Sequence, residues 1–301
     1  MNTAIDAEPA TCAAGDLFIY KNAAVEAVLR KQLFFILGCQ KSGTTWLQHL
    51  LNGHPEIACN GETVFVHTVL APLNEVVKKY NKAQKIGQAA QLDGADAQYL
   101  FSVVFSLVLA KWGLAEGITC VGEKTPEHST SAEMLATVFP SARFVHIVRD
   151  PRDIAVSGWF HNLRQKGDAF HKRFATLTDY ARFIAKVHWP TMVGRSRVVR
   201  NAHPERYLEL RYEDMLTEPE ARVAEILTFL GVDAGAEAVG ACLEAGSFKK
   251  LSGGRDSGSE DRGSFFRKGV AGDWKNHLDE AAAAVFPQYL GEAMCELGYE
   301  H

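Results

Sequence analysis

Residues 33–46, LFFILGCQKSGTTW, decide the fold. The apolar run from Leu33 to Leu37 has no polar alternation and ends at Gly38, which is typical of a parallel strand covered on both faces. A helical pattern follows at once, with apolar side chains on one side: Trp46, Leu47, Leu50 and Leu51. Strand, glycine-containing turn and helix open many nucleotide-binding folds. Such a turn directs backbone N–H groups and the positive end of a helix dipole at one point, so residues 38–46 predict a phosphate site.

This turn does not have the lysine register of a loop that hydrolyses nucleoside triphosphates. That loop needs G-x-x-x-x-G-K-[ST], whereas here Thr44 follows Gly43 and Lys41 stands two residues before the glycine. The lysine and the magnesium-binding hydroxyl are therefore displaced, and the sequence offers no convincing partner for nucleotide-bound Mg²⁺. Gly43 still permits close backbone approach, and Thr44 and Thr45 add hydroxyl donors for phosphate oxygens. The pattern favours a phosphate loop that works without magnesium.

Further strand and helix patterns predict the rest of an α/β fold. Strands are expected at 118–121, 144–148 and 207–210. Helices are expected at about 99–112, 130–138, 152–162, 178–190 and 219–230. Strands that alternate with helices imply right-handed crossovers, and hence a central parallel sheet flanked by helices.

The chain is expected to form one domain over residues 16–301, because no repeat or interdomain linker interrupts it. Residues 1–15 are small and lack an apolar period, which predicts a flexible tail. The segment 64–112 is mainly helical and is expected to form a helical cap beside the carboxyl edge of the sheet. Residues 252–264, SGGRDSGSEDRGS, predict a mobile loop that orders as a lid over bound nucleotide.

Bulk properties exclude several partners. The net charge of −4 gives no overall attraction for nucleic acid or anionic lipid, so any bound anion must be held by a local cluster of positive groups. The six cysteines include no C-x-x-C pair, which argues against a structural zinc site or a redox dithiol. The N-terminus lacks the basic start of a secretory signal, and the longest apolar stretch, residues 99–110, is too short to span a bilayer. We expect a cytoplasmic protein with no membrane span and no metal site.

The hexapeptide Lys41-Ser42-Gly43-Thr44-Thr45-Trp46 resembles the 5′-phosphosulfate loop of the sulfotransferase family. Four later segments resemble the other donor-binding motifs of that family, in the family's order. By resemblance they supply Arg149 and Ser157 for the 3′-phosphate, Tyr212 beside the adenine, Ser247 and Phe248 at the base, and Arg267, Lys268 and Gly269 closing over the 3′-phosphate. The resemblance implies a P-loop-NTPase-like sulfotransferase fold that uses 3′-phosphoadenylyl sulfate (PAPS) as donor and releases 3′,5′-adenosine bisphosphate (PAP).

The residues themselves agree with these roles. A donor with a 5′-phosphosulfate and a 3′-phosphate needs two anion sites, and the loop at 41–45 can provide one. Arg149 suits the other, because a guanidinium binds phosphate in a planar, bidentate manner. Trp46 and Phe248 can hold a purine between their faces.

Sulfuryl transfer requires in-line positioning and neutralisation of charge on the leaving oxygen. The transferred group carries less negative charge than a phosphoryl group, so lysine side chains can do what a metal does elsewhere. We expect Lys41 to stabilise the bridging oxygen of the leaving nucleotide. Lys124, in Gly122-Glu123-Lys124-Thr125-Pro126, resembles a second family lysine near the transferred group.

The general base differs from that of the cytosolic members that act on small phenols and steroids. Those members carry K-T-H where this chain has Lys124-Thr125-Pro126, and proline cannot accept a proton. Residues 54–63, HPEIACNGET, instead resemble the protein-tyrosine and related sulfotransferases, which place a catalytic glutamate at a similar point. Glu62 is therefore the expected base. His67 and His128 are the alternatives.

The acceptor is left open between a phenol, a sugar, a lipid head group and a peptide tyrosine, with a small molecule favoured. Residues 159–174, WFHNLRQKGDAFHKRF, are expected to line or gate its cleft, although their charges could equally solvate a helix and loop. Two other functions are kept as alternatives: a nucleotide kinase, and a non-catalytic protein that binds PAP. The family's short C-terminal dimer motif is absent, so no oligomeric state is assigned.

Overall fold

A computed structural model describes residues 14–84 and 90–299. Its centre is a five-stranded parallel sheet in the order β2-β3-β1-β4-β5. The strands are β1 (Gln32–Leu37), β2 (Ile57–Gly61), β3 (Cys120–Lys124), β4 (Arg143–Val148) and β5 (Tyr207–Arg211). The prediction of a parallel sheet flanked by helices is confirmed.

The strands match the expected segments at β1, β4 and β5, whereas β3 and β2 differ. The strand expected at 118–121 runs from Cys120 to Lys124, and its last two side chains, Glu123 and Lys124, are buried despite their charge. β2 was not predicted, because its five residues, IACNG, are short and only partly buried at the edge of the sheet. A pattern of apolar residues reveals neither a strand that ends in buried charged residues nor a short strand that is partly buried at the edge of a sheet.

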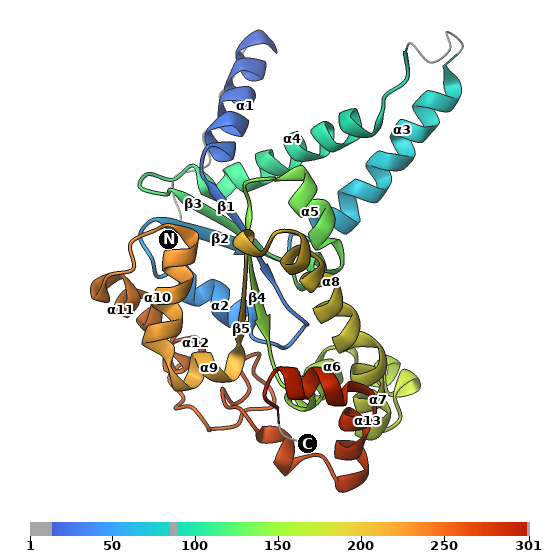
Figure 1. Ribbon diagram of the computed structural model, residues 1–301, viewed down its shortest axis with the longest axis vertical. Coiled ribbons are helices and arrows are strands. Elements are labelled where there is room, and N and C mark those ends of the chain that lie inside the picture. The colour runs from blue at the N-terminus through green and yellow to red at the C-terminus, as the bar shows by residue number, and fades with distance from the viewer. Residues whose placement is uncertain (1–13, 85–89, 300–301) are drawn as a thin grey trace.

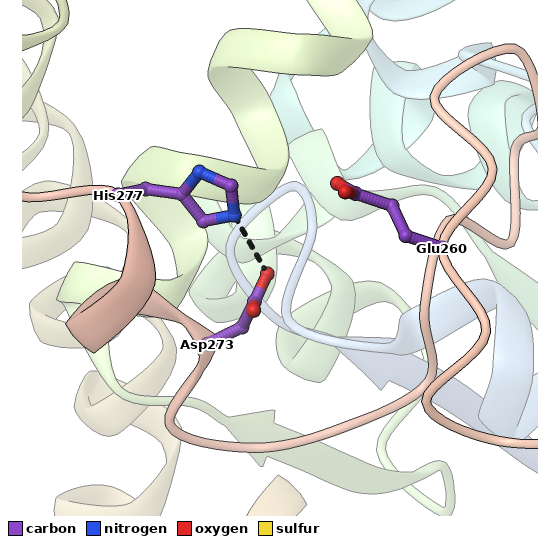
Figure 2. A group of neighbouring side chains, drawn as sticks. All are labelled: Glu260, Asp273 and His277. Carbon is purple, nitrogen blue, oxygen red and sulfur yellow. Dashed lines mark ion pairs between the residues drawn. The ribbon is translucent and has the colours of Figure 1, made fainter.

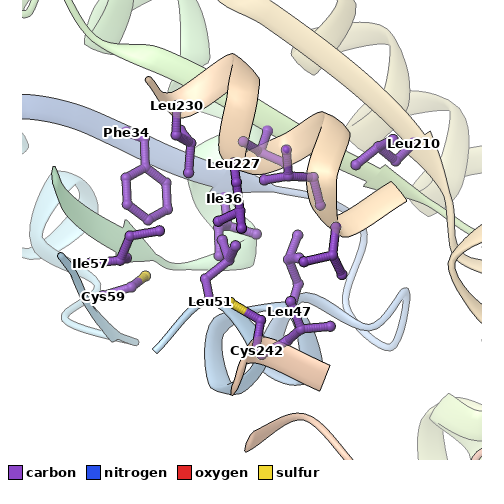
Figure 3. Packing of buried hydrophobic residues seen from close by; sticks show 14 of the residues in the cluster. Phe34, Ile36, Leu47, Leu51, Ile57, Cys59, Leu210, Leu227, Leu230 and Cys242 are labelled. Atoms are coloured by element: carbon purple, nitrogen blue, oxygen red, sulfur yellow. The ribbon is translucent and has the colours of Figure 1, made fainter. Parts of the chain in front are cut away.

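Both faces of β1 are buried, as its unbroken apolar run predicted. Phe34 and Ile36 point to one face, where they meet Leu47 and Leu51 of α2 (Thr44–Leu51) and Leu227 of α10 (Pro219–Leu230) (Figure 3). The alternating residues of β1, beginning with Leu33, point to the other face and join the core formed with α4 (Gly94–Gly113) and α5 (Ala132–Val138). Because successive side chains of a strand point to opposite faces, β1 contributes to two separate hydrophobic cores.

The remaining helices complete the layers. They are α1 (Ala14–Leu29), α3 (Ala71–Ala83), α6 (Pro151–Arg173), α7 (Leu177–Phe183), α8 (Trp189–Ala202), α9 (Tyr212–Thr217), α11 (Ala236–Ala245), α12 (Phe248–Leu251) and α13 (Glu280–Glu296). Helices α6, α7 and α13 form a third apolar cluster at the carboxyl ends of the strands. No helix in the described residues is both long enough and apolar enough to cross a bilayer.

The segment expected to form a cap takes a different position. Its helices α3 and α4 extend away from the sheet at the end opposite α6, α7 and α13 (Figure 1). Among the described residues of 64–112, only Val64 lines the large cavity described below. The expected tail, residues 1–15, lies outside the described residues except for Ala14 and Gly15, where α1 begins. Residues 252–264 form turns without regular structure, tied together by Arg255, which donates to the carbonyls of Ser259, Phe266 and Arg267.

Candidate functional site

A cavity of about 940 Å³ lies where the parallel strands end. Its walls come from the turn after β1, the residues that follow β4 and β5, helices α6, α7 and α12, and the segment 265–270. Ligand pockets for single small molecules run from about 300 to 1,000 Å³, so this volume can hold a nucleotide and a second molecule together. In open α/β sheets, ligands bind at this edge.

The turn after β1 has the backbone of a phosphate loop. Gly43 has a φ of 106°, and a Cβ there would lie 2.8 Å from the Tyr212 ring, so only glycine fits. Lys41 is also in the left-handed region, with a φ of 74°. Helix α2 begins at Thr44, directly after the turn, and its N-terminus therefore faces the cavity. Of the expected loop residues, Lys41, Gly43, Thr44, Thr45 and Trp46 line the cavity.

Ser42 lies beneath the turn instead. Its side chain is buried, and its Oγ has no hydrogen-bond partner among the described residues. The Nε atom of Arg149 is in the same condition. Arg149 lines the cavity, so a ligand there could reach its guanidinium, whereas the Ser42 hydroxyl is directed toward Gly38 under the turn.

Arg149 ties three parts of the site together. Its guanidinium donates to the carbonyl of Lys41 at 3.1 Å and to that of Val270 at 3.0 Å, and it lies 4.3 Å from the centre of the Tyr212 ring. Asp153, one turn into α6, accepts the backbone N–H groups of Gly272 and Trp274 at 2.7 and 2.9 Å. The phosphate loop, the start of α6 and the C-terminal loop are therefore fixed against one another.

The two cations of the C-terminal motif are held by carboxylates. Arg267 donates to Glu260 and Asp273, and Lys268 donates to Asp273. Burial alone would raise the pKa of Asp273, but the hydrogen bonds from Lys268 and Arg267 outweigh it and hold the pKa well below its ordinary value. The cations keep their place near the cavity through these contacts.

The same carboxylates form a group with the spacing of metal ligands. Ligand atoms of Glu260, Asp273 and His277 lie within 4.8 Å of one another, and the His277 Nε2 atom is 3.2 Å from Asp273 (Figure 2). Both carboxylates, however, already neutralise Arg267 and Lys268. We therefore assign this group to positioning the two cations.

One end of the cavity is built for a flat ring. The Trp46 indole N–H donates to the carbonyl of Gly246 at 2.8 Å, and its ring meets that of Tyr212 edge-on, with centres 5.4 Å apart. Phe248 lines the same end and packs so closely on Gly269 that a Cβ at the glycine would lie 2.3 Å from the ring. Every residue expected to bind the donor nucleotide, apart from Ser42, lines this cavity, and Ser157 and Ser247 complete the set.

Charged groups meet beside the phosphate loop, where Lys41 and Glu62 line the cavity and Lys124 contacts the wall from behind. Lys124 is almost fully buried, and its Nζ donates to Thr45 Oγ1 at 3.1 Å and to Glu62 Oε1 at 2.6 Å. Glu62 is at the cavity wall with 61% of its side chain exposed, and its φ of 57° is unusual for a residue other than glycine. Burial first, and then Arg164 and Arg149, lower the pKa of Lys41 from 10.5 to about 8. An exposed carboxylate, a desolvated lysine and the phosphate loop therefore lie together at this wall.

Neither histidine considered as an alternative base reaches the cavity. His128 is fully buried, because Pro126 starts a short helical turn that carries the imidazole into the core, against Phe35 and with Nδ1 2.8 Å from Glu123. The structure therefore does not bring His128 to the cavity with the other residues expected to be catalytic. His67 is on the surface, with Nε2 3.4 Å from the carbonyl of Glu127, and does not line the cavity.

The other end of the cavity is lined by part of 159–174, as expected, and by residues that the sequence did not single out. The missed residues at this end are Tyr180, Phe183 and His188; Phe265 and Phe266, also missed, line the cavity beside Lys41 and His49. Of the basic residues in 159–174, Lys166 and Arg173 line the cavity, whereas Arg164 donates to the carbonyl of Ser264. Aromatic residues at 170, 174, 180 and 183 have helical spacing, which is the one signal that could have revealed this wall.

Fold and site together define an α/β protein of P-loop type, with a phosphate-loop backbone beside a large cavity at the carboxyl ends of the strands. A family model described as the sulfotransferase family matches residues 34–235, and this chain belongs to that family.

Several relatives place the chain within the family. Protein-tyrosine sulfotransferase 2 of Gallus gallus is 28% identical over 66% of this chain, but the chain covers only 51% of that protein. Human sulfotransferase 2A1 is 25% identical, with 91% of this chain and 88% of the relative covered. Among solved structures, mouse sulfotransferase SULT7A1 complexed with PAP has a TM-score of 0.57 at 19% identity, covering 91% of this chain and 88% of the other. Sulfotransferase STF9 from Mycobacterium avium has a TM-score of 0.55 at 15% identity, covering 94% and 81%. These two likenesses support the fold alone.

Proposed function

We propose that this chain transfers a sulfuryl group from PAPS to a hydroxyl or amine of a small acceptor molecule. One observation carries the proposal: Glu62, Lys124 and Lys41 meet at the junction between a nucleotide end with two anion sites and an aromatic second end. PAPS supplies the activated sulfuryl group. The residues that would hold it are the phosphate loop at 41–45, Arg149 and Ser157, Trp46 and Phe248, and Arg267 to Gly269.

In this mechanism Glu62 accepts the proton of the acceptor hydroxyl as its oxygen forms a bond to sulfur. The bond from sulfur to the bridging phosphate oxygen breaks, and Lys41 stabilises the charge that this oxygen gains. Lys124 holds the carboxylate of Glu62 through its hydrogen bond and so fixes the direction of proton transfer. Lys41 can supply the positive charge that the leaving group needs, so we propose a reaction without a metal.

The first experiment is calorimetric titration with PAP, run beside ATP with Mg²⁺. We expect PAP to bind, ATP to bind far more weakly, and Arg149→Ala to lose PAP binding. Arg182→Ala is a suitable control, because Arg182 is exposed and does not line the cavity. Equal binding of ATP with Mg²⁺ would favour the kinase alternative. PAP binding without turnover of labelled PAPS, over a broad acceptor panel, would favour the non-catalytic alternative.

We also propose a reducing, cytoplasmic location. Cys39, Cys59, Cys120 and Cys242 are buried free thiols, which is the usual state of cysteine in such a compartment. Fractionation of cell extracts, followed by immunodetection of the protein in each fraction, would test the location directly.

A further inference from the structure

The second end of the cavity is an aromatic chamber formed by Phe170, Phe174, Tyr180 and Phe183. The rings of Phe170, Phe174 and Tyr180 are buried and contact one another with centres 5.1 to 5.4 Å apart. Phe183 adds a further face 5.2 Å from the ring of Phe174. A wall of packed rings favours a flat apolar molecule over a sugar or an extended peptide, both of which need many polar partners.

The charged residues around this chamber are mainly positive. Lys166 and Arg173 both line the cavity, and neither forms an ion pair with any residue in the described ranges. The guanidinium of Arg173 lies over the rings of Phe174 and Phe183, at 5.1 and 5.2 Å from their centres, so its edge remains available to an anion.

Two acidic residues line the cavity and offset these cations only in part. Glu62 is paired with Lys124 at the reacting end. Glu127 accepts a hydrogen bond from the neutral amide of Gln40 at 2.8 Å and keeps its charge, which acts on His188. His161 also lines the cavity. Burial first, and then the positive charges of Lys41 and neighbouring cations, lower the pKa of His161 to about 4. This histidine is therefore neutral at physiological pH and leaves the positive charge to the lysine and arginine side chains.

The backbone places both cations on one cavity. Helix α6 is broken at Gly167, where φ is 44° and ψ is −119°, a conformation that favours glycine. Lys166 stands before the break and Arg173 after it, and both reach the wall. The break at Gly167 thus allows two cations from one helix, on either side of the break, to line the same cavity.

We propose that the acceptor is an aromatic hydroxyl compound that also carries an anionic group, such as a carboxylate, which Lys166 and Arg173 recognise. This inference rests on the proposed sulfuryl transfer. The ring system occupies the aromatic chamber, the hydroxyl faces Glu62, and the anion meets the two cations at the far side. Charge complementarity of this kind selects among acceptors of one shape.

A matched pair of acceptors tests the inference: 6-hydroxy-2-naphthoate and its methyl ester, which differ in charge and hardly in shape. We expect kcat/KM to be about tenfold higher for the acid, as two partly exposed cations would give. In the double variant Lys166→Gln/Arg173→Gln, this ratio should fall to about one. Lys172→Gln is the control, since Lys172 is exposed on the same helix but does not line the cavity, and it should keep the wild-type ratio.

Binding measurements separate this inference from the proposed function. Fluorescence titration of the acid and the ester, with and without PAP, needs no turnover, and PAP affinity of the double variant shows that it is folded. If PAP binds but the ester binds as well as the acid, the acceptor class is wrong and the donor assignment stands. If PAP does not bind, the proposed function fails, while an acid preference that depends on Lys166 and Arg173 still supports the anion site. Faster turnover of an acidic tyrosine peptide or of a neutral phenol than of the naphthoate would also overturn the inference.

Discussion

Lys41 should set an alkaline limit on activity. Its pKa is lowered from 10.5 to about 8, with burial as the main cause and Arg164 and Arg149 next. If the protonated lysine stabilises the leaving oxygen, activity is present below pH 8 and is lost as the pH rises through that value. One pH unit above the pKa, about a tenth of the lysine remains protonated, so kcat/KM for PAPS should fall about tenfold between pH 7 and pH 9.

The assay is a pH profile of kcat/KM for PAPS, taken with an alkyl hydroxyl acceptor whose own ionisation lies far above pH 10. Lys41→Arg provides the decisive comparison, because a guanidinium stays protonated throughout the range. We expect lower activity for this variant at pH 7 but no fall up to pH 9. A wild-type profile that is flat to pH 9.5, or the same fall in Lys41→Arg, would refute the role given to Lys41.

The lowered pKa of Lys41 should also affect stability, which is expected to rise with pH over a range in which activity falls. Between pH 8 and 10.5 the unfolded chain keeps the Lys41 proton that the folded chain has released, so the free energy of unfolding should rise with pH in this window. At ~1.4 kcal/mol per pH unit, the buried charge costs at most about 3 kcal/mol below pH 8. Lys41→Met should therefore raise the unfolding free energy in urea at pH 7 while it abolishes turnover. Unchanged stability would mean that the lysine is better solvated than the structure indicates.

Three further predictions follow from the surroundings of the site. Glu62→Gln should lower kcat by about 10²-fold or more with PAP affinity nearly unchanged. His128→Ala should instead lower the free energy of unfolding in urea by about 3–5 kcal/mol, because Glu123 loses its buried partner, and the folded fraction should stay active. The reverse result would restore His128 as the base. Asp153→Ala removes the acceptor of two backbone N–H groups, so we expect a loss of about 2–4 kcal/mol in stability together with weaker PAP binding by calorimetry. Val64→Asn should stabilise the protein by about 1 kcal/mol, because asparagine tolerates a φ of 50° better than a β-branched residue; a lower Tm would contradict this reasoning.

The donor half of the site could be predicted from the sequence because it depends on local structure. A strand, a glycine turn and a helix N-terminus bring residues 38–46 to one point without help from distant parts of the chain. Arg149 and Tyr212 each come directly after a strand of the same parallel sheet, which brings them to its carboxyl edge, although it was the resemblance to the family motifs that singled them out. The other donor-site residues were predicted from their resemblance to the family's motifs.

The acceptor half depends on tertiary packing and was harder to predict. The direction of α4 is set by its contacts with α1, β2 and β3, and α3 packs against α4; no local pattern encodes this arrangement. His128 stands four residues after Lys124, yet the short helical turn that begins at Pro126 places it in the core. The partners of Arg267 and Lys268, which are Glu260 and Asp273, are likewise acidic residues that composition alone would assign to solvent.

The polar end of β3 explains both why that strand was misjudged and how the reacting end is held. The described part of the chain has three residues other than glycine at positive φ, namely Lys41, Glu62 and Val64, and all three line the cavity. Each such conformation costs about 1–3 kcal/mol and persists only when its surroundings enforce it. Here the N–H of Glu62 donates to the carbonyl of Lys124 at 2.7 Å, and the buried carboxylate of Glu123 accepts the hydroxyl of Thr63 at 2.9 Å. The charged residues that hide β3 from a polarity pattern are therefore those that hold the segment carrying Glu62 in its strained position, so loss of the Glu123 contact should relax Glu62 before it unfolds the sheet.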